Sequence, residues 1–321
     1  MPDTVPPLRQ TVLSDREVTQ WNVGSLLLTL PLLLLGFYYY GGQALRLAVI
    51  AAAAAVLIEL AAGRVLLRRN TLRDWNAVVI GLWIACMLPA QISPLYAVAG
   101  TAFAILVVKL PFGGTQNAPF VPAAAGFAFL SVCFPEAVFR FQSSDIIAPV
   151  DERSLASYLL EGGSLFNDRQ LAPILLGQTV GPMGTGGILV IAAVLAATLL
   201  IRQRRSAALA SLGFVATVAA LALLFPRSFG SRWGALGMEL SSGCLLFAAV
   251  YLLPDPAQLP RRWYTRLGYG VLAGVFCVLL RHLGSYEENV CFAILLANAT
   301  TPLLIRIQDE IHHLRSIRAE K

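Results

Sequence analysis

Residues 109–135, KLPFGGTQNAPFVPAAAGFAFLSVCFP, join a polar turn to an apolar run and set the pattern for the whole chain. Gly113 and Gly114 allow the backbone to turn tightly, and Asn117 can cap the helix that follows. The two prolines of the segment APFVP suit the first turn of a helix, where the backbone amides lack helical partners. We therefore expect an apolar helix over residues 119–135.

Apolar segments of this kind recur on both sides of that stretch. The ten segments are 23–40, 47–63, 77–89, 96–110, 119–135, 185–201, 206–225, 239–253, 267–283 and 289–305. Of the 321 residues, 57% are hydrophobic and 13% are charged, which excludes an ordinary water-soluble protein. A helix crosses the hydrocarbon core with about 20 mostly apolar residues. The sequence therefore predicts an all-α, polytopic membrane protein with about ten transmembrane helices, some of them short or broken.

Positive charges predict the orientation of these helices. If the N-terminus is cytoplasmic, 17 of the 24 Lys and Arg residues fall in cytoplasmic stretches and 7 in outer ones. The positive-inside rule then favours two cytoplasmic termini. The expected organisation is a cytoplasmic segment 1–22, a first membrane repeat 23–135, an outward-facing loop 136–184, a second membrane repeat 185–305 and a cytoplasmic tail 306–321.

The two membrane halves share matching residues, which indicates an internal repeat. The pairs separated by 172 positions are Lys109 and Arg281, Asn117 and Asn289, and Phe120 and Phe292. Five helices in each half would invert the second copy relative to the first, and such repeats place binding regions at their interface. Asn117 and Asn289 are candidates to bind a ligand there. The alternative is structural hydrogen bonding between helices.

The remaining polar residues exclude several kinds of site. Five cysteines lie singly in apolar runs, so they form no iron–sulfur or zinc motif, and we expect packed thiols. The chain has no recognisable catalytic motif and no metal site, and its scattered positive charges do not suit nucleic acid. Glu239 faces either a cavity or the water interface, and Asp255, between two prolines, suits a turn. Gly270 and Gly274 predict close helix packing.

Several motifs in order along the chain resemble one known family. They lie at 73–82 (RDWNAVVIGL), 113–123 (GGTQNAPFVPA), 239–243 (ELSSG), 254–256 (PDP) and 281–302 (from Arg281 to Pro302). These are similar to motifs of the D subunit of the Rnf electron-transport complex and of its relative, the B subunit of the sodium-pumping NADH:quinone reductase. Val121 replaces an asparagine of the family pattern.

This resemblance implies a function. Such a chain would be the flavin-carrying membrane subunit of an Rnf-type complex, an ion-translocating oxidoreductase, and would not be catalytic alone. The complex would couple electron transfer between ferredoxin and NAD to sodium or proton translocation across a bacterial or archaeal cytoplasmic membrane. Implied partners are other membrane, flavoprotein and iron–sulfur subunits and the lipid bilayer. Implied cofactors are covalent FMN and noncovalent riboflavin.

The resemblance also implies a site for the covalent FMN. Family members attach it as a phosphoester within D-x-x-[ST]-G-A-[ST], and residues 151–157 read DERSLAS. Asp151, Ser154, Ala156 and Ser157 match this pattern, with Ser157 as the candidate acceptor for a flavin transferase. Leu155 stands in place of the glycine. The alternative is that this segment opens an amphipathic surface helix capped by Asp151.

Two rival functions also fit the sequence. The inverted five-helix repeat is typical of urea-transporter-like channels or transporters, which carry out no redox chemistry. A family member without covalent flavin would instead be a membrane scaffold for the other subunits. Bound flavin would argue against the transporter, and a covalent adduct would argue against both.

Overall fold

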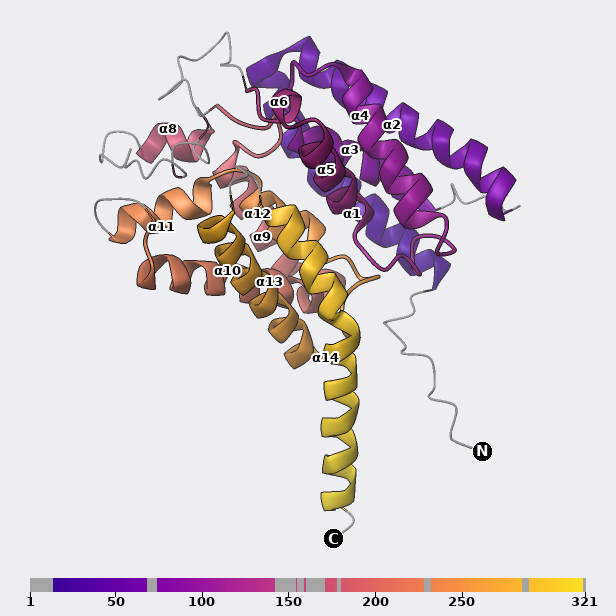
Figure 1. Ribbon diagram of the computed structural model, residues 1–321, viewed down its shortest axis with the longest axis vertical. Coiled ribbons are helices and arrows are strands. Elements are labelled where there is room, and N and C mark those ends of the chain that lie inside the picture. The colour runs from indigo at the N-terminus through magenta and orange to yellow at the C-terminus, as the bar shows by residue number, and fades with distance from the viewer. Residues whose placement is uncertain are drawn as a thin grey trace.

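The computed structural model describes residues 14–67, 74–141, 154, 159, 171–177, 180–227, 232–284 and 289–319 (Figure 1). Every regular element in these residues is helical. The first half contains α1 (Asp15–Tyr40), α2 (Gly42–Ala62), the π-helix η1 (Gly63–Leu67), α3 (Asn76–Met87), α4 (Pro94–Phe103), the π-helix η3 (Ala104–Lys109), α5 (Pro122–Cys133) and α6 (Pro135–Val138). The second half contains α8 (Leu171–Leu176), α9 (Ile188–Leu200), α10 (Arg202–Leu224), α11 (Arg232–Ser241), α12 (Leu245–Phe247), the π-helix η4 (Ala248–Leu252), α13 (Trp263–Leu283) and α14 (Val290–Ala319).

All ten expected apolar segments lie on these helices. Among the residues that the structure describes, five helices are long and apolar enough to cross a membrane: α1, α2, α10, α13 and α14. A sixth candidate is α11 together with α12 and η4, which are bent by 65° at their junction. Four shorter apolar helices complete the set: α3, α4 with η3, α5 and α9. The prediction of an all-α polytopic membrane protein is confirmed.

The same helix pairings occur in both halves. In the first, α2 packs against α1, α3 and α4, and α4 packs against α5. In the second, α10 packs against α9, α11 and α13, and α13 packs against α14. The corresponding last helices, α5 and α14, contact each other across the two halves. This arrangement is the one that the internal repeat predicts.

Side chains of α1 connect the two halves. The Arg204 Nη2 atom on α10 donates to Ser25 Oγ at 3.1 Å, and its guanidinium lies 4.2 Å from the Trp21 ring centre. Tyr251 on η4 donates through its hydroxyl to the carbonyl oxygen of Leu28. Desolvated cation–π contacts and buried hydrogen bonds of this kind hold helices in a fixed register.

Close backbone packing joins α10 and α13, as Gly270 and Gly274 of α13 predict. A Cβ atom at Gly270 would lie 2.1 Å from the carbonyl oxygen of Ala210, and one at Gly274 would lie 2.8 Å from the Thr217 Cβ. Neither position has room for a larger residue. Small residues let membrane helices approach closely, so the interpretation of this GxxxG motif is confirmed.

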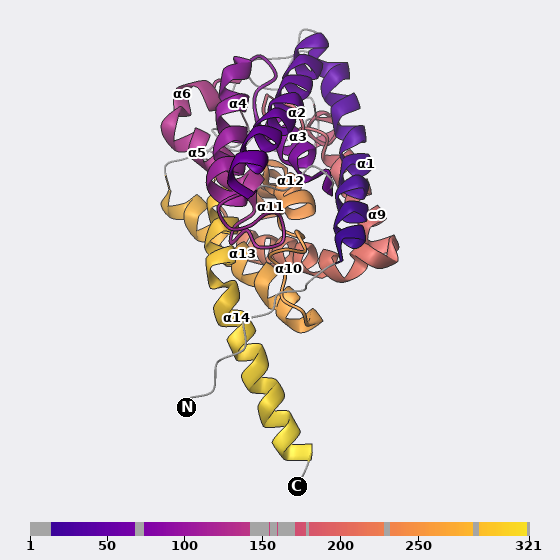
Figure 2. The same cartoon turned by 90° about the vertical axis from the view of Figure 1, so that its right-hand side faces the viewer.

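The helix boundaries differ from the predicted segments at both ends of the chain. Helix α1 begins at Asp15, where Ser14 and Glu17 form a capping box, and not at 23. Helix α14 continues to Ala319, so the predicted tail from 306 onward is largely an extension of the last helix. The start of α1 and the end of α14 lie toward the same end of the molecule (Figure 2). An even number of crossings requires this arrangement.

Candidate functional site

A buried lysine holds two acidic side chains where η3 ends. Lys109 Nζ lies 2.8 Å from both carboxylate oxygens of Glu59, and both side chains are fully buried. The same nitrogen lies 3.8 Å from Asp74 Oδ2, and the Asp74 side chain is 22% exposed. We name Lys109, Glu59 and Asp74 the Lys109 cluster. With all three groups ionised it carries one surplus negative charge.

Local geometry at the start of α3 fixes Asp74. Its Oδ1 atom accepts from the backbone N–H of Asn76 at 3.1 Å, and its carbonyl accepts from Asn22 Nδ2 at 2.8 Å. Thr115 donates its hydroxyl to Asp74 Oδ2. Trp75 adopts the left-handed conformation with φ of 59°, which turns the chain into α3. A carboxylate at a helix N-terminus is also favoured by the helix dipole.

A polar cavity of about 1,000 Å³ opens onto the Lys109 cluster. Asp74 and Lys109 border it, together with the start of α1 and the turn from Gly113 to Asn117. Gly113 and Gly114 have φ angles of 94° and 109°, which only glycine adopts without strain. The glycine pair therefore shapes the cavity wall, and we name this cavity the vestibule.

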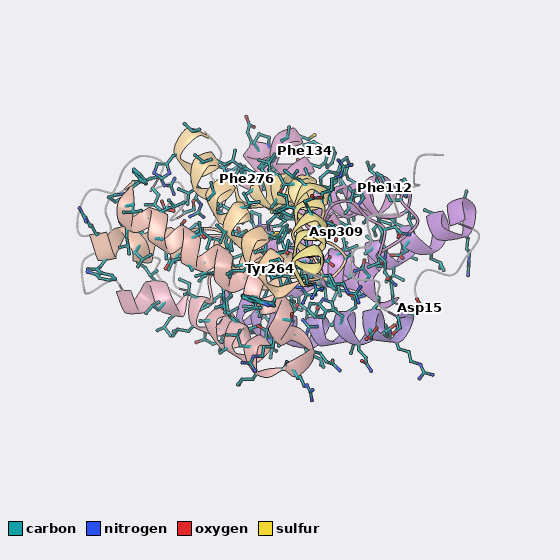
Figure 3. The ribbon with its side chains drawn as sticks, turned by 90° about the horizontal axis from the view of Figure 1, so that it is seen from below. Asp15, Phe112, Phe134, Tyr264, Phe276 and Asp309 are labelled. Carbon is teal, nitrogen blue, oxygen red and sulfur yellow. The ribbon has the colours of Figure 1, made fainter. Side chains whose placement is uncertain are left out.

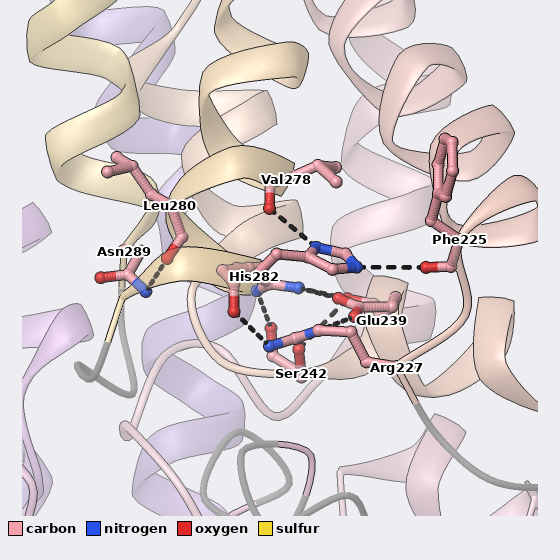
Figure 4. Close-up of polar contacts among 9 residues, drawn as sticks. Phe225, Arg227, Glu239, Ser242, Val278, Leu280, His282 and Asn289 are labelled. Carbon is pink, nitrogen blue, oxygen red and sulfur yellow. Dashed lines mark hydrogen bonds and ion pairs between the residues drawn. The ribbon is translucent and has the colours of Figure 1, made fainter.

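A second buried cluster lies between α11 and α13 (Figure 4). Arg281 Nη1 lies 2.6 Å from Glu239 Oε2, and Arg227 Nε contacts Glu239 Oε1. Arg281 also donates to the carbonyl oxygens of Glu239 at 2.9 Å and of Ser242 at 3.1 Å. Arg227 donates to the Arg281 carbonyl at 2.9 Å. We name Arg227, Glu239 and Arg281 the Arg281 cluster, which carries one surplus positive charge.

The internal repeat relates the two clusters. Lys109 and Arg281 are 172 positions apart, and each lies in the last turn of the fourth main helix of its half. Asp74 and Glu239 are 165 positions apart, the offset that also relates Leu88-Pro89 to Leu253-Pro254. Each half thus pairs a cation at the end of its fourth helix with an acid near its short or broken third helix.

Asp255 lies near the Lys109 cluster in the loop after η4. Its Oδ1 atom accepts from the backbone N–H of Ala257 at 3.0 Å, so its predicted role as a turn residue is confirmed. Burial raises the pKa of the Asp255 carboxyl to about 6, against the opposing effects of the Ala257 N–H and the Lys109 charge. The positive charge of Lys109 therefore interacts electrostatically with the Asp255 carboxyl in this loop.

The predicted flavin-site residues are only partly within the described chain. Ser154 is buried, and so is the nearby Leu159. Asp151, Ala156 and Ser157 lie outside the described residues. Of the motif, the structure describes only Ser154, which is buried. The assignment of Ser157 as the acceptor stays a prediction.

The two asparagines of the repeat occupy different surroundings. Asn117 is exposed and borders the vestibule. Asn289 is buried and donates through Nδ2 to the Leu280 carbonyl at 3.0 Å. Their binding of a ligand at the repeat interface stays a prediction.

Sequence reasoning missed most of both clusters. Glu59 was not recognised, although a carboxylate inside the alanine-rich run 47–63 is costly and therefore a signal of function. Glu239 is buried in an ion-pair cluster and does not lie at the water interface, whereas the alternative that it faces a cavity stays a prediction. The spacing of Lys109 and Arg281 in the sequence indicates a repeat but does not show that either residue belongs to a site.

The cysteines fit the expectation of packed thiols with one exception. Cys86, Cys244, Cys277 and Cys291 are buried, whereas Cys133 at the end of α5 is exposed. In the part of the chain that the structure describes, no group of three His, Cys, Asp or Glu side chains could hold a metal ion.

Known proteins match most of this chain. The model of the NQR2, RnfD, RnfE family matches residues 10–312. A relative from Klebsiella pneumoniae (strain 342), the D subunit of an ion-translocating oxidoreductase complex, is 31% identical over 274 residues, covering 73% of this chain and 76% of the relative. The D subunit of the same name from Tolumonas auensis is 27% identical over 291 residues, covering 78% of this chain and 82% of the relative.

Proposed function

Because the chain belongs to the NQR2, RnfD, RnfE family, we propose that it is the flavin-carrying membrane subunit of an Rnf-type ion-translocating oxidoreductase. The complex would couple electron transfer between ferredoxin and NAD to sodium or proton translocation. The observation that carries the proposal is the match over residues 10–312, joined by relatives that are subunits of ion-translocating oxidoreductase complexes.

The proposal requires partner subunits. The five cysteines lie singly in the sequence, and the described residues offer no cluster of metal ligands. A chain without iron–sulfur ligands must receive electrons from one subunit and pass them to another. We propose membrane, flavoprotein and iron–sulfur subunits as these partners, and a flavin transferase as the enzyme that modifies the chain.

We propose Ser157 as the attachment point of FMN. Its hydroxyl oxygen would become the bridging atom of the phosphoester, with Asp151, Ser154 and Ala156 completing the recognition motif. Of this segment the structure describes Ser154 and Leu159, and both are buried. When bound, the flavin supplies one- or two-electron transfer. Noncovalent riboflavin, as in the family, is proposed without assigned residues.

Mass analysis of peptides tests the covalent site. In protein produced together with its flavin transferase, the peptide containing Ser157 should carry the added mass of FMN, and Ser157→Ala should remove it. Ser154→Ala, the matched serine control, should retain part of the modification, and Leu155→Gly should retain or increase it. If the Ser157 peptide is unmodified while the same transferase modifies another protein, the covalent site is wrong. The chain would then be a membrane scaffold without covalent flavin.

We also propose separate roles for the two buried clusters in ion translocation. The Lys109 cluster borders a polar cavity of about 1,000 Å³ and presents the partly exposed Asp74 carboxylate to it, which suits the attraction of a cation. The Arg281 cluster donates to two backbone carbonyls beside the break after α11. It would brace the broken helix.

The proposed orientation places both termini, and with them the vestibule, in the cytoplasm of a bacterial or archaeal cell. The loop 136–184 would then face outward, where a transferase can reach Ser157. Cysteines introduced singly into this loop should react with a membrane-impermeant maleimide added to intact cells. Labelling only after the membrane is opened would reverse the orientation and remove the flavin proposal with it.

A further inference from the structure

A groove lined by apolar side chains runs along one flank of α5. Its volume is about 550 Å³. The lining residues come from α4, η3, α5, α14 and the turn before α5: Phe103, Val107, Val108, Phe112, Phe120, Ala125, Ala128, Phe129, Val132, Cys133, Phe292 and Leu295. Phe103 and Phe129 stack in parallel with ring centres 4.4 Å apart and form one firm wall. We name this feature the apolar groove.

A polar cavity of about 710 Å³ lies at the end of α5. The turn between α3 and α4 forms one side of it with Gln91 and Ser93, and the α6 region forms the other with Glu136 and Arg140. Tyr96 and Phe134 stand between them with ring centres 5.1 Å apart. We name this feature the head cavity.

The apolar groove and the head cavity adjoin each other at the end of α5. Cys133 lines both, and Phe134, which lines the head cavity, packs edge-on against Phe129 of the groove. Phe112 and Phe134, from the two features, lie on the same side of the molecule in the view of Figure 3. The 12 residues of α5 span about 18 Å, close to the roughly 15 Å of one leaflet's hydrocarbon layer.

The head cavity offers groups of both charge signs together with an unused acceptor. Glu136 and Arg140 are both exposed, and neither has an ion-pair partner in the described chain. The Gln91 Oε1 atom is buried and accepts no hydrogen bond within the described residues. A buried acceptor without a donor costs free energy unless a ligand or water satisfies it.

From this adjacency of apolar and polar surfaces we propose that the two features form a binding site for one phosphatidylethanolamine molecule. An acyl chain lies in the apolar groove beside Phe103 and Phe129. Arg140 binds the phosphate, and Glu136 with Gln91 Oε1 accepts hydrogen bonds from the ammonium group. The lipid belongs to the leaflet on the side where α5 ends.

The head group follows from charge and hydrogen bonding. A phosphate suits Arg140 because guanidinium–phosphate hydrogen bonds are charge-assisted. The ammonium of phosphatidylethanolamine has three N–H donors for Glu136 and Gln91, whereas the choline group of phosphatidylcholine has none. The glycerol head group of phosphatidylglycerol carries no positive charge, so it cannot form an ion pair with Glu136. The site therefore discriminates among lipids of equal chain length.

Cys133 provides a direct reporter, because it lies where the two features meet and is the one exposed cysteine of the five. The full-length chain is purified in mild detergent, stripped of lipid and treated with N-ethylmaleimide. Added phosphatidylethanolamine should slow labelling of Cys133 roughly tenfold, since it satisfies a charged hydrogen bond that the other lipids cannot. Phosphatidylcholine and phosphatidylglycerol with the same chains should slow it less than about twofold.

Two variants test the binding of the lipid head group and of the acyl chain separately. Arg140→Gln should lose the protection by phosphatidylethanolamine, whereas Arg46→Gln, an exposed arginine on α2, should keep it. Ala128→Leu fills the apolar groove and should lose lipid retention in native mass spectrometry. Ala53→Leu, at an exposed position of α2, is the matched control.

Three results would overturn the proposal. If the three lipids protect Cys133 equally, the site has no head-group specificity. This measurement uses only the wild-type protein. Unchanged protection in Arg140→Gln would remove the phosphate contact, with Glu136→Gln as the second variant if the first does not fold. Cys133 that resists labelling without lipid and cross-links to a co-purified subunit would assign the groove to a partner helix.

Discussion

The Lys109 and Arg281 clusters occupy matching positions in the two halves but differ in charge and in surroundings. Lys109 lies between two carboxylates and borders the vestibule. Arg281 shares one carboxylate with a second arginine and also holds two backbone carbonyls. The three named residues carry a formal charge of −1 in the first cluster and +1 in the second. The repeat preserves the position of the ion pair and changes its chemistry.

The choice of cation explains much of this difference. A lysine ammonium is a compact charge on a flexible stem, so it can move relative to its two partners. An arginine guanidinium forms several hydrogen bonds in a fixed plane and keeps its charge under all physiological conditions. The Lys109 cluster thus suits a site where charge changes during function, and the Arg281 cluster suits a rigid brace. Substitutions that break each cluster in turn should expose that contrast.

The largest effect should come from removing the shared acid of the Arg281 cluster. Glu239→Gln leaves two buried guanidinium groups that cannot lose their charge, so the free energy of unfolding should fall by about 3–5 kcal/mol. Thermal unfolding in detergent and the yield of folded protein measure this loss. A variant as stable as the wild type would show that the cluster does not brace the fold.

Removing the cation of the Lys109 cluster should cost less. Lys109→Met leaves Glu59 and Asp74 without this counter-ion, but Asp74 is 22% exposed and keeps its hydrogen bonds from Asn76 and Thr115. We expect a loss below the roughly 3–5 kcal/mol of a fully uncompensated buried charge. Thermal unfolding in detergent checks this, and a loss equal to that of Glu239→Gln would contradict the contrast.

Exchanging arginine for lysine should have a still smaller, local effect. Arg281→Lys keeps the charge beside Glu239 but loses the forked donation to the Glu239 and Ser242 carbonyls. The expected cost is about 1–3 kcal/mol from unsatisfied acceptors. Proteolysis or hydrogen exchange should show the change at residues 239–252 first, and uniform destabilisation of both halves would argue against a local brace.

The smallest effect should appear at Asp255. Its folded pKa of about 6 exceeds the ordinary value of 3.8, so the folded protein binds the proton more tightly. The stabilisation is present below about pH 4 and is lost as pH rises through 6. Relative to the wild type, Asp255→Asn should therefore gain thermal stability between pH 4 and pH 7. Asp309→Asn, on the exposed end of α14, controls for net charge, and an equal trend there would contradict the assignment.

The sequence predicts the helices well because their apolar runs are long and continuous. All ten expected segments lie on helices, and Gly270 and Gly274 of α13 lie at close contacts. The ends are less predictable. The capping box moves the start of α1 to Asp15, and the polar residues after 306 continue the last helix, because hydropathy marks membrane segments and not helix limits.

The site was less predictable because its members come from distant parts of the chain. Glu59 and Lys109 are 50 positions apart, and Arg281 meets Glu239 across 42. Matching residues in the two halves reveal equivalent positions, but they do not show which acid each cation meets. The partner depends on where the third helix is short or broken, and the three-dimensional packing decides that.

The most direct test removes one charged group from each cluster within the intact complex. Asp74→Asn keeps the cap on α3 and leaves Lys109 paired with Glu59, while Arg227→Gln leaves Glu239 paired with Arg281. In proteoliposomes, the ions moved per electron transferred should fall roughly tenfold in Asp74→Asn, since a unit charge near a cation is worth more than about 1 kcal/mol. Arg227→Gln should leave this ratio unchanged. Normal coupling in Asp74→Asn, or an equal loss in both variants, would contradict the separate roles of the two clusters.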